Sequence, residues 1–226
     1  MFVGHTAVAL AAKSRAPRTS LGVFVAAAFA PDLLWPIFLF LGLEHVRIDP
    51  GNTAFTPLAF DSYPWSHSLL MTIVWGAVGA ALVRLGRGDR QTQILVMLLV
   101  VSHWVLDVVS HRADMPLWPG RSLLLGLGLW NSVVATLAIE GAMLAIGLML
   151  YLRSTKAADR VGSLAFWSFI GVMTFMWAGQ PWSSPPHSPR DLAWFGLVGA
   201  WLLPTWAWWA DRHRVALSKA PSRRHA

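Results

Sequence analysis

Apolar runs long enough to cross a membrane dominate this chain of 226 residues. We place six of them at approximately 20–43, 67–85, 91–111, 131–152, 161–179 and 190–211. Because a bilayer core requires about 20 apolar residues of helix, each run predicts one transmembrane helix. Residues 1–12 form a shorter apolar segment that precedes basic residues, which is the wrong order for a signal peptide. The expected fold is all-α: a polytopic transmembrane helical bundle of about six spanning helices plus a short N-terminal apolar helix.

The composition agrees with a membrane protein. Hydrophobic residues make up 55% of the chain and charged residues 13%, which is too apolar for a soluble domain of this size. The sequence contains no cysteine, so neither a disulfide nor a cysteine-based zinc site can form.

Lysine and arginine gather in alternate connections between the apolar runs. Of the 18 basic residues, 14 lie in the segments 13–18, 84–90, 153–160 and 212–226. The positive-inside rule puts these segments, and with them the C-terminus, in the cytoplasm. The predicted location is a bacterial-type inner (plasma) membrane, crossed several times. The net charge of +7 is then a topology signal, so we expect membrane lipid as a partner and no nucleic acid.

Ionisable residues that lie well inside the apolar runs are all in the first 140 residues. The last two runs instead carry many tryptophans, which favour membrane interfaces. We therefore predict a metal-site membrane module in residues 1–152. Residues 153–226 are predicted to form a Trp-rich helical hairpin and a basic cytoplasmic tail, and the proline-containing loop 179–191 is expected to cap the module.

The stretch SHWVLDVVSH, residues 102–111, carries the strongest chemical signal. On a helix, His103 and Asp107 are separated by four residues and share a face, with His111 one turn further along. Imidazole and carboxylate are common ligands of zinc and manganese, so this spacing is compatible with two ligands of one ion. The spacing is equally compatible with a His–Asp hydrogen bond that joins helices.

The predicted depths of the other ionisable groups favour one buried site. Asp32 and Glu140 fall near the middle of the membrane, whereas His5 and His67 fall in the outer half, as the stretch 102–111 does. Pro31 is expected to bend its helix and aim Asp32 inward. Ser66 is read as the N-cap of the helix that His67 enters. Asp114 is read as a turn residue in preference to a ligand.

The order of short motifs resembles a known family. These motifs are GHTAVA at 4–9, PD at 31–32, SHS at 66–68, HWVLD at 103–107 and MPLWP at 115–119. Residues 1–120 thereby resemble the YdjM-like (LexA-regulated) membrane-bound metal-dependent hydrolases. The resemblance implies a divalent metal, zinc or alternatively manganese, with five ligands: His5, Asp32, His67, His103 and Asp107.

A more distant similarity extends to zinc-dependent phospholipase C and related single-strand nucleases. In that comparison His111 and Glu140 match later ligands, and each is a candidate for holding a second ion or acting as general base. This chain departs from the family pattern at Leu34, where the family commonly has Asp, and at Ser62–Pro64, where it commonly has His-Arg-Gly.

Three functions remain as hypotheses. The preferred one is an integral-membrane metal-dependent hydrolase that acts on a phosphoester or lipid-linked substrate at the outer half of the bilayer. The alternative is a proton-coupled transporter that uses the His, Asp and Glu side chains as a proton relay. The third is a catalytically inactive protein in which the same residues hold the bundle together.

Overall fold

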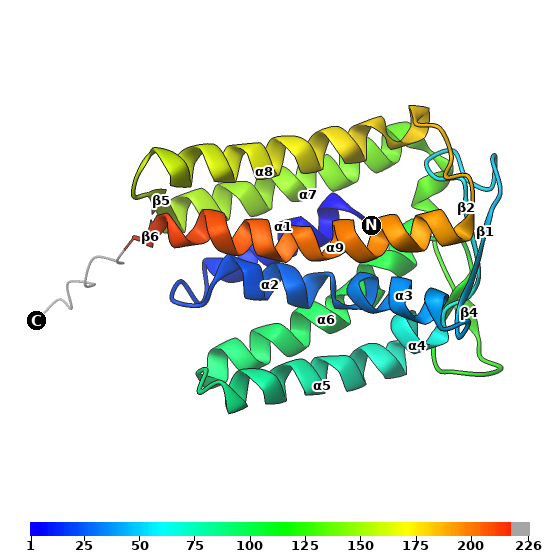
Figure 1. Cartoon of the computed structure of the whole chain (residues 1–226), viewed down its shortest axis with the longest axis horizontal. Helices are drawn as coiled ribbons and strands as arrows, with labels where there is room; N and C mark the ends of the chain where they lie inside the picture. Colours follow the sequence, from blue (N-terminus) through cyan, green and yellow to red (C-terminus); the bar gives the residue numbers. More distant parts are fainter. Residues whose placement is uncertain (218–226) are drawn as a thin grey trace, which may run out of the picture.

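The computed structural model describes residues 1–217, which form a helical bundle with short hairpins at both ends (Figure 1). The long helices are α5 (Leu69–Leu85), α6 (Arg90–Ser110), α7 (Val133–Ser154), α8 (Arg160–Gly179) and α9 (Pro189–Arg212). The shorter helices are α1 (Val3–Lys13), α2 (Leu21–Ala28), α3 (Ala30–Phe40) and α4 (Pro64–His67), with 3-10 turns at Leu129–Asn131 and Gln180–Trp182. The mainly helical fold expected from the sequence is confirmed.

Within residues 1–217, three helices are long and apolar enough to cross a membrane: α6, α7, and α8 with the 3-10 turn that follows it. Helices α2 and α3 make a fourth candidate if they are counted as one bent span. Helix α5 is apolar but has only 17 residues, and α9 has 24 residues but is rich in tryptophan. The membrane character is thus supported, whereas the number of six spans stays a prediction.

The run 20–43 is divided into two helices that meet at an angle of 54°. Helix α2 begins after Ser20, whose side chain accepts a hydrogen bond from the backbone N–H of Gly22. It ends at Ala28, and α3 begins at Ala30 with Pro31 in its first turn. Pro31 is tolerated there because the first-turn N–H groups of a helix have no partner within the helix. The break leaves Asp32 in the first turn of a helix.

The four basic connections come together at one end of the bundle. The hydroxyls of Thr19 and Thr92 lie 2.6 Å apart and join the α1–α2 connection to the first turn of α6. Strand β5 (Thr155–Ala157) pairs antiparallel with β6 (Arg214–Ala216) at the same end, on the left of Figure 1. This grouping is what the alternation of basic segments predicts. The predicted tail beyond residue 217 lies outside the described residues.

The opposite end carries two further hairpins, on the right of Figure 1. Strand β1 (His45–Ile48) pairs antiparallel with β2 (Leu58–Ser62), and β3 (Met115–Pro116) pairs with β4 (Leu124–Leu125). A small apolar cluster that includes Trp35, Tyr63 and Met115 packs beneath them. The sequence analysis did not predict these strands, and they cover the end of the bundle nearest to the polar residues.

Helix α1 runs through the interior of the bundle and is buried along most of its length. It packs closely on α7, where a Cβ at Gly147 would lie only 2.4 Å from the carbonyl oxygen of Ala7. Helix α9 packs along α2 and α3, so the C-terminal hairpin lies against the N-terminal helices. The location of α1 carries His5 into the centre of the protein, where the other polar side chains gather.

Candidate metal centre

Helix α6 presents His103 and Asp107 on one buried face. The Nε2 atom of His103 lies 3.0 Å from Oδ2 of Asp107. The other carboxylate oxygen, Oδ1, lies 3.1 Å from Nε2 of His5 and contacts the amino group of Met1. The rings of His5 and His103 stack with their centroids 3.9 Å apart. Asp107 therefore stands between two imidazoles, with one oxygen toward each.

The break between α2 and α3 orients His103. The Nδ1 atom of His103 lies 2.8 Å from the carbonyl oxygen of Ala28, the last residue of α2. Carbonyls at the end of a helix have no intrahelical partner, so this one is free to accept a hydrogen bond. A carbonyl can only accept, which means that Nδ1 of His103 carries the proton. Its Nε2 atom, facing Asp107, is then the one that can bind a metal.

His67 is oriented by a chain of hydrogen bonds that begins at Glu44. The Ser66 hydroxyl donates to Oε2 of Glu44 at 2.7 Å, and its own oxygen, Oγ of Ser66, lies 2.6 Å from Nδ1 of His67. Because the hydroxyl proton goes to Glu44, Ser66 accepts from Nδ1–H and leaves Nε2 of His67 free. Burial raises the pKa of Glu44, while the hydrogen bonds from Ser66 and Trp65 oppose that rise.

The cap of helix α5 is Ser68, whose side chain accepts from the N–H of Met71. The N-cap predicted at Ser66 is therefore wrong by two residues. Helix α4, a single turn that contains Ser66, is capped instead by Glu44, whose Oε1 accepts from the N–H groups of Trp65 and Ser66 at 2.8 Å each. Ser66 is thereby left free to bridge Glu44 and His67.

Asp32 and His67 bring further ligand atoms to the His103–Asp107 pair. Nε2 of His67 lies 3.3 Å from Nε2 of His103 and 3.4 Å from Oδ1 of Asp32. The distance from Nε2 of His103 to Oδ1 of Asp32 is 3.8 Å, and that from Nε2 of His67 to Oδ2 of Asp107 is 3.9 Å. Four side chains from three helical segments thus surround one point.

The five distances between these atoms, 3.0–3.9 Å, are near those expected between the ligands of a metal ion. Four ligands about 2.0–2.1 Å from a zinc ion lie about 3.3 Å from one another, close to the distances between these atoms. The Nε2 atoms of His67 and His103 both carry lone pairs and face each other at 3.3 Å, an arrangement that a cation between them stabilises. Two overlapping groups could hold an ion: His5, His103 and Asp107, and Asp32, His67 and His103.

His111 is the C-cap of α6 and approaches the cluster from the end of the bundle that carries β1–β4. Its Nε2 lies 4.0 Å from Oδ2 of Asp107, while its Nδ1 lies 3.0 Å from Oδ1 of Asp114. The Tyr63 hydroxyl donates to the same Asp114 oxygen at 2.7 Å. Burial and the neighbouring Asp114 raise the pKa of Tyr63 well above its usual value, which keeps this donor protonated. Asp114 lies in a turn, as predicted, and also orients His111.

Glu140 does not lie against the imidazoles. Its Oε2 accepts hydrogen bonds from the backbone N–H groups of Phe2 at 2.9 Å and Gly4 at 3.2 Å. These are groups at the start of α1, where a carboxylate also interacts favourably with the helix dipole. The structure therefore brings His111, but not Glu140, next to the five residues predicted as ligands.

One side of the cluster is open to a cavity of about 510 Å³. Asp32, His67, Asp107 and His111 line its polar end, and α8 and α9 line much of the rest. The Asp32 side chain is 34% exposed, whereas the other side chains of the cluster are buried. Asp32 is thus the member of the cluster that a molecule in the cavity reaches most easily.

No family model, no curated protein and no solved structure matches the chain. The resemblance to membrane-bound metal-dependent hydrolases therefore rests on the motifs alone, and the geometry of the site has to carry the functional argument.

Two contributors to this site were not found from the sequence. Glu44 follows an apolar run and is nearly completely buried, yet it lies 22 residues before the Ser66 hydroxyl that it accepts from. Tyr63 belongs to a segment with no periodic pattern. The signal that could have indicated Glu44 is its charge at the very end of an apolar run, where a buried acid needs a partner.

Proposed function

We propose that the protein is an integral-membrane metal-dependent hydrolase that acts on an ester or phosphoester at the outer half of the bilayer. The observation that carries this proposal is the convergence of Asp32, His67, His103 and Asp107 at ligand-like distances. In two of these, His67 and His103, Nδ1 donates to an acceptor outside the cluster, which directs Nε2 toward the cluster. Such outer hydrogen bonds are the usual support of metal-binding histidines.

In this proposal His5 is the fifth ligand and lies on the side of Asp107 that carries Oδ1. Zinc or manganese suits the nitrogen and oxygen donors. When bound, the divalent ion supplies Lewis-acid chemistry: it polarises the ester or phosphoryl oxygen and lowers the pKa of water. His111 serves as the general base, because its Nδ1 is tied to Asp114 and its Nε2 faces the cluster. Glu140 positions α1, and with it His5, by holding the backbone of Phe2 and Gly4.

The reaction on a phosphoester is a displacement by water. The water oxygen forms a bond to phosphorus, and the bond between phosphorus and the leaving alcohol oxygen breaks. His111 takes up a proton from the attacking water and then gives it to the leaving oxygen, which departs as the alcohol. Asp32, at the exposed edge of the cluster, faces the side from which the substrate arrives.

Metal analysis tests the proposal directly. We expect protein purified gently from membranes to contain a stoichiometric transition metal by elemental analysis, and His103→Ala to lose it while the helix content is retained. A wild type that holds no metal and takes none up would contradict the proposal. That result would favour a proton-coupled transporter or a purely structural cluster, which require no transition metal.

The membrane arrangement in this proposal has six spans, with the basic end of the bundle in the cytoplasm of a bacterial-type cell. The chain contains no cysteine, so single cysteines report topology without background. We expect Arg84→Cys and Lys156→Cys to resist a membrane-impermeant thiol reagent on intact cells. Asn52→Cys and Ser184→Cys are expected to react. Labelling of the first pair from outside would invert the arrangement.

A further inference from the structure

Helices α8 and α9 touch in the half nearest the basic end and separate toward the other end. The Trp206 indole N–H donates to the carbonyl of Ala165 at 3.0 Å, and the rings of Phe169 and Trp206 lie 6.0 Å apart. At the other end the helices are joined through the segment 183–188, whose two prolines cannot continue a helix. A cavity of about 680 Å³ lies between the separated ends.

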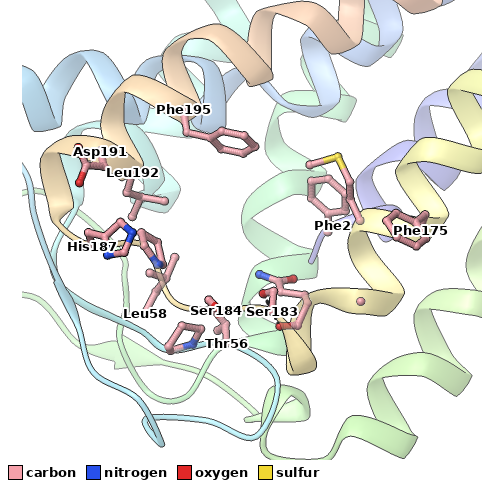
Figure 2. Close-up of a pocket in the computed structure, with 15 residues that line it drawn as sticks. Phe2, Thr56, Leu58, Phe175, Ser183, Ser184, His187, Asp191, Leu192 and Phe195 are labelled. Carbon is pink, nitrogen blue, oxygen red and sulfur yellow. Dashed lines mark hydrogen bonds between the residues drawn. The ribbon is translucent and has the colours of Figure 1, made fainter.

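Figure 2 shows how this cavity is built. Phe175 of α8 and Phe195 of α9 stand on its two sides, and Phe2 lies beside Phe175. The rings of Phe175 and Phe195 are 79% and 64% exposed, so both reach the outer surface of the bundle at the level of the helices. The polar lining residues, Ser183 and His187 among them, lie at the loop end. The cavity thus has a polar rim toward the external side and an apolar flank toward lipid.

The cavity lies next to the one that ends at the candidate metal centre. The cavity of Figure 2 and the cavity that ends at Asp107 share five lining residues: Phe2, Leu58, Met176, Gln180 and Phe195. Four of these five residues are apolar, so a molecule between α8 and α9 that extends toward the imidazoles passes mainly apolar side chains. Each cavity is within the roughly 300–1,000 Å³ of ordinary small-molecule sites.

The cavity that ends at Asp107 is lined in part by a glycine, and the missing side chain leaves space in it. A Cβ at Gly199 of α9 would meet only the Phe195 ring, at 3.8 Å. Gly199 lines the cavity, so a larger residue there would extend into it without striking the backbone of another helix. A long apolar space that ends at two carboxylates and two imidazoles is complementary to a molecule with a hydrocarbon chain and a polar head.

We propose that the substrate is a membrane amphiphile whose hydrocarbon chain occupies this space and whose phosphoester head reaches the cluster. It arrives laterally from the outer leaflet between α8 and α9, past Phe175 and Phe195. The chemistry at the head rests on the proposed function above, whereas the binding of the chain does not. Burial of the chain against the apolar lining provides the binding free energy, and the cluster selects the head.

Photochemical capture tests the binding. A benzophenone amino acid replaces Phe195, and in a control protein it replaces Trp167, which is 48% exposed on α8 but lines neither cavity. The probe is radiolabelled hexadecyl phosphate in phosphatidylcholine vesicles. We expect position 195 to capture at least about tenfold more probe than position 167, corresponding to 1.4 kcal/mol of preferential binding. Equal capture at the two positions would overturn the proposal.

A cavity-filling variant provides the second measurement. Gly199→Phe is expected to lower capture at position 195 about tenfold or more. Gly171→Phe is the matched control, because a Cβ at Gly171 meets nothing within 4 Å and this residue is exposed outside both cavities. Metal content checks that both variants keep the centre. Capture that Gly199→Phe leaves unchanged, in a protein that retains metal, would contradict the proposal.

Hydrolysis distinguishes this proposal from the proposed function. Gly199→Phe is expected to slow hydrolysis of a long-chain phosphodiester much more than that of a short, water-soluble one. If the wild type hydrolyses both substrates and the variant slows both equally, the proposed binding of the hydrocarbon chain is contradicted and the proposed hydrolase function is supported. If the wild type hydrolyses neither but captures the probe selectively at position 195, the hydrolase function is contradicted and the binding of the chain is supported.

Discussion

Replacing Asp107 with Asn keeps the shape of the side chain and removes its negative charge. The two possible roles of Asp107 respond differently to that change. As a residue that only joins helices, it links α6 to α1 through His5 at 3.1 Å, in addition to its 3.0 Å contact with His103 of its own helix. As a ligand, it supplies both a donor atom and the charge that makes cation binding favourable.

The structure sets the size of each effect. An Asn amide nitrogen 3.0 Å from the unprotonated Nε2 of His103 can donate a hydrogen bond to it within α6. The Asn carbonyl oxygen can still accept from Nε2 of His5 and from the amino group of Met1, so α6 stays joined to the α1 segment. Hydrogen bonds between membrane helices contribute about 0.6 kcal/mol on average and about 1.7 kcal/mol at most, which limits the expected loss of stability. Residues that merely orient a metal ligand change metal affinity about 10–100-fold. Loss of the ligand itself is therefore expected to weaken affinity by more than about 100-fold, or about 2.8 kcal/mol.

The assay compares metal content by elemental analysis, metal affinity by competition with a chelator, and thermal unfolding in the same detergent. We expect Asp107→Asn to lose metal while the helix content is retained. His111→Gln is the control and is expected to have a milder effect, since His111 lies 4.0 Å from Asp107. An Asp107→Asn protein with full metal content and unchanged affinity would refute the argument that Asp107 is a ligand.

Three more predictions concern the supports of the site and the bundle. Ser66→Ala removes the hydroxyl between Glu44 and His67 and is expected to weaken metal affinity about 10–100-fold in the chelator assay, with unchanged affinity as the contrary result. Gly147→Val brings a side chain against the backbone of α1 and is expected to destabilise the protein by about 1–3 kcal/mol or more, whereas Gly171→Val is not; equal unfolding midpoints would contradict this. Lys13→Met leaves Asp211 buried without its cation and is expected to cost about 3–5 kcal/mol in denaturant unfolding; an unchanged free energy of unfolding would contradict this.

The polar residues were predictable because a membrane protein tolerates few of them. The position of each His and Asp along its apolar run predicts its depth in the membrane. Five of these residues lie close together in the structure. Depth does not give the facing direction, however, and this is why Glu140 was grouped with the imidazoles. Its depth is compatible with the cluster, but its carboxylate is directed to the start of α1.

The orienting groups could not be predicted for a different reason. Glu44, Ser66 and Asp114 act through contacts that depend on how short, irregular segments fold at the end of the bundle. Such segments have no periodicity, so their contacts are set by tertiary packing rather than by local sequence. The short strands β1 and β2 were missed for the same reason, because the apolar periods of the long helices dominate the sequence.

The break between α2 and α3 positions both His103 and Asp32 of the candidate metal centre. Ala28 ends one helix and holds the ring of His103, while Asp32, four residues later, lies in the first turn of the next. A substitution that restored one continuous helix would engage the Ala28 carbonyl with the N–H of Asp32, and would thereby release the ring of His103 and redirect the Asp32 carboxylate. Conversely, an ion bound by both Asp32 and His103 would hold the bend. Occupancy of the site and the angle between α2 and α3 are therefore expected to change together.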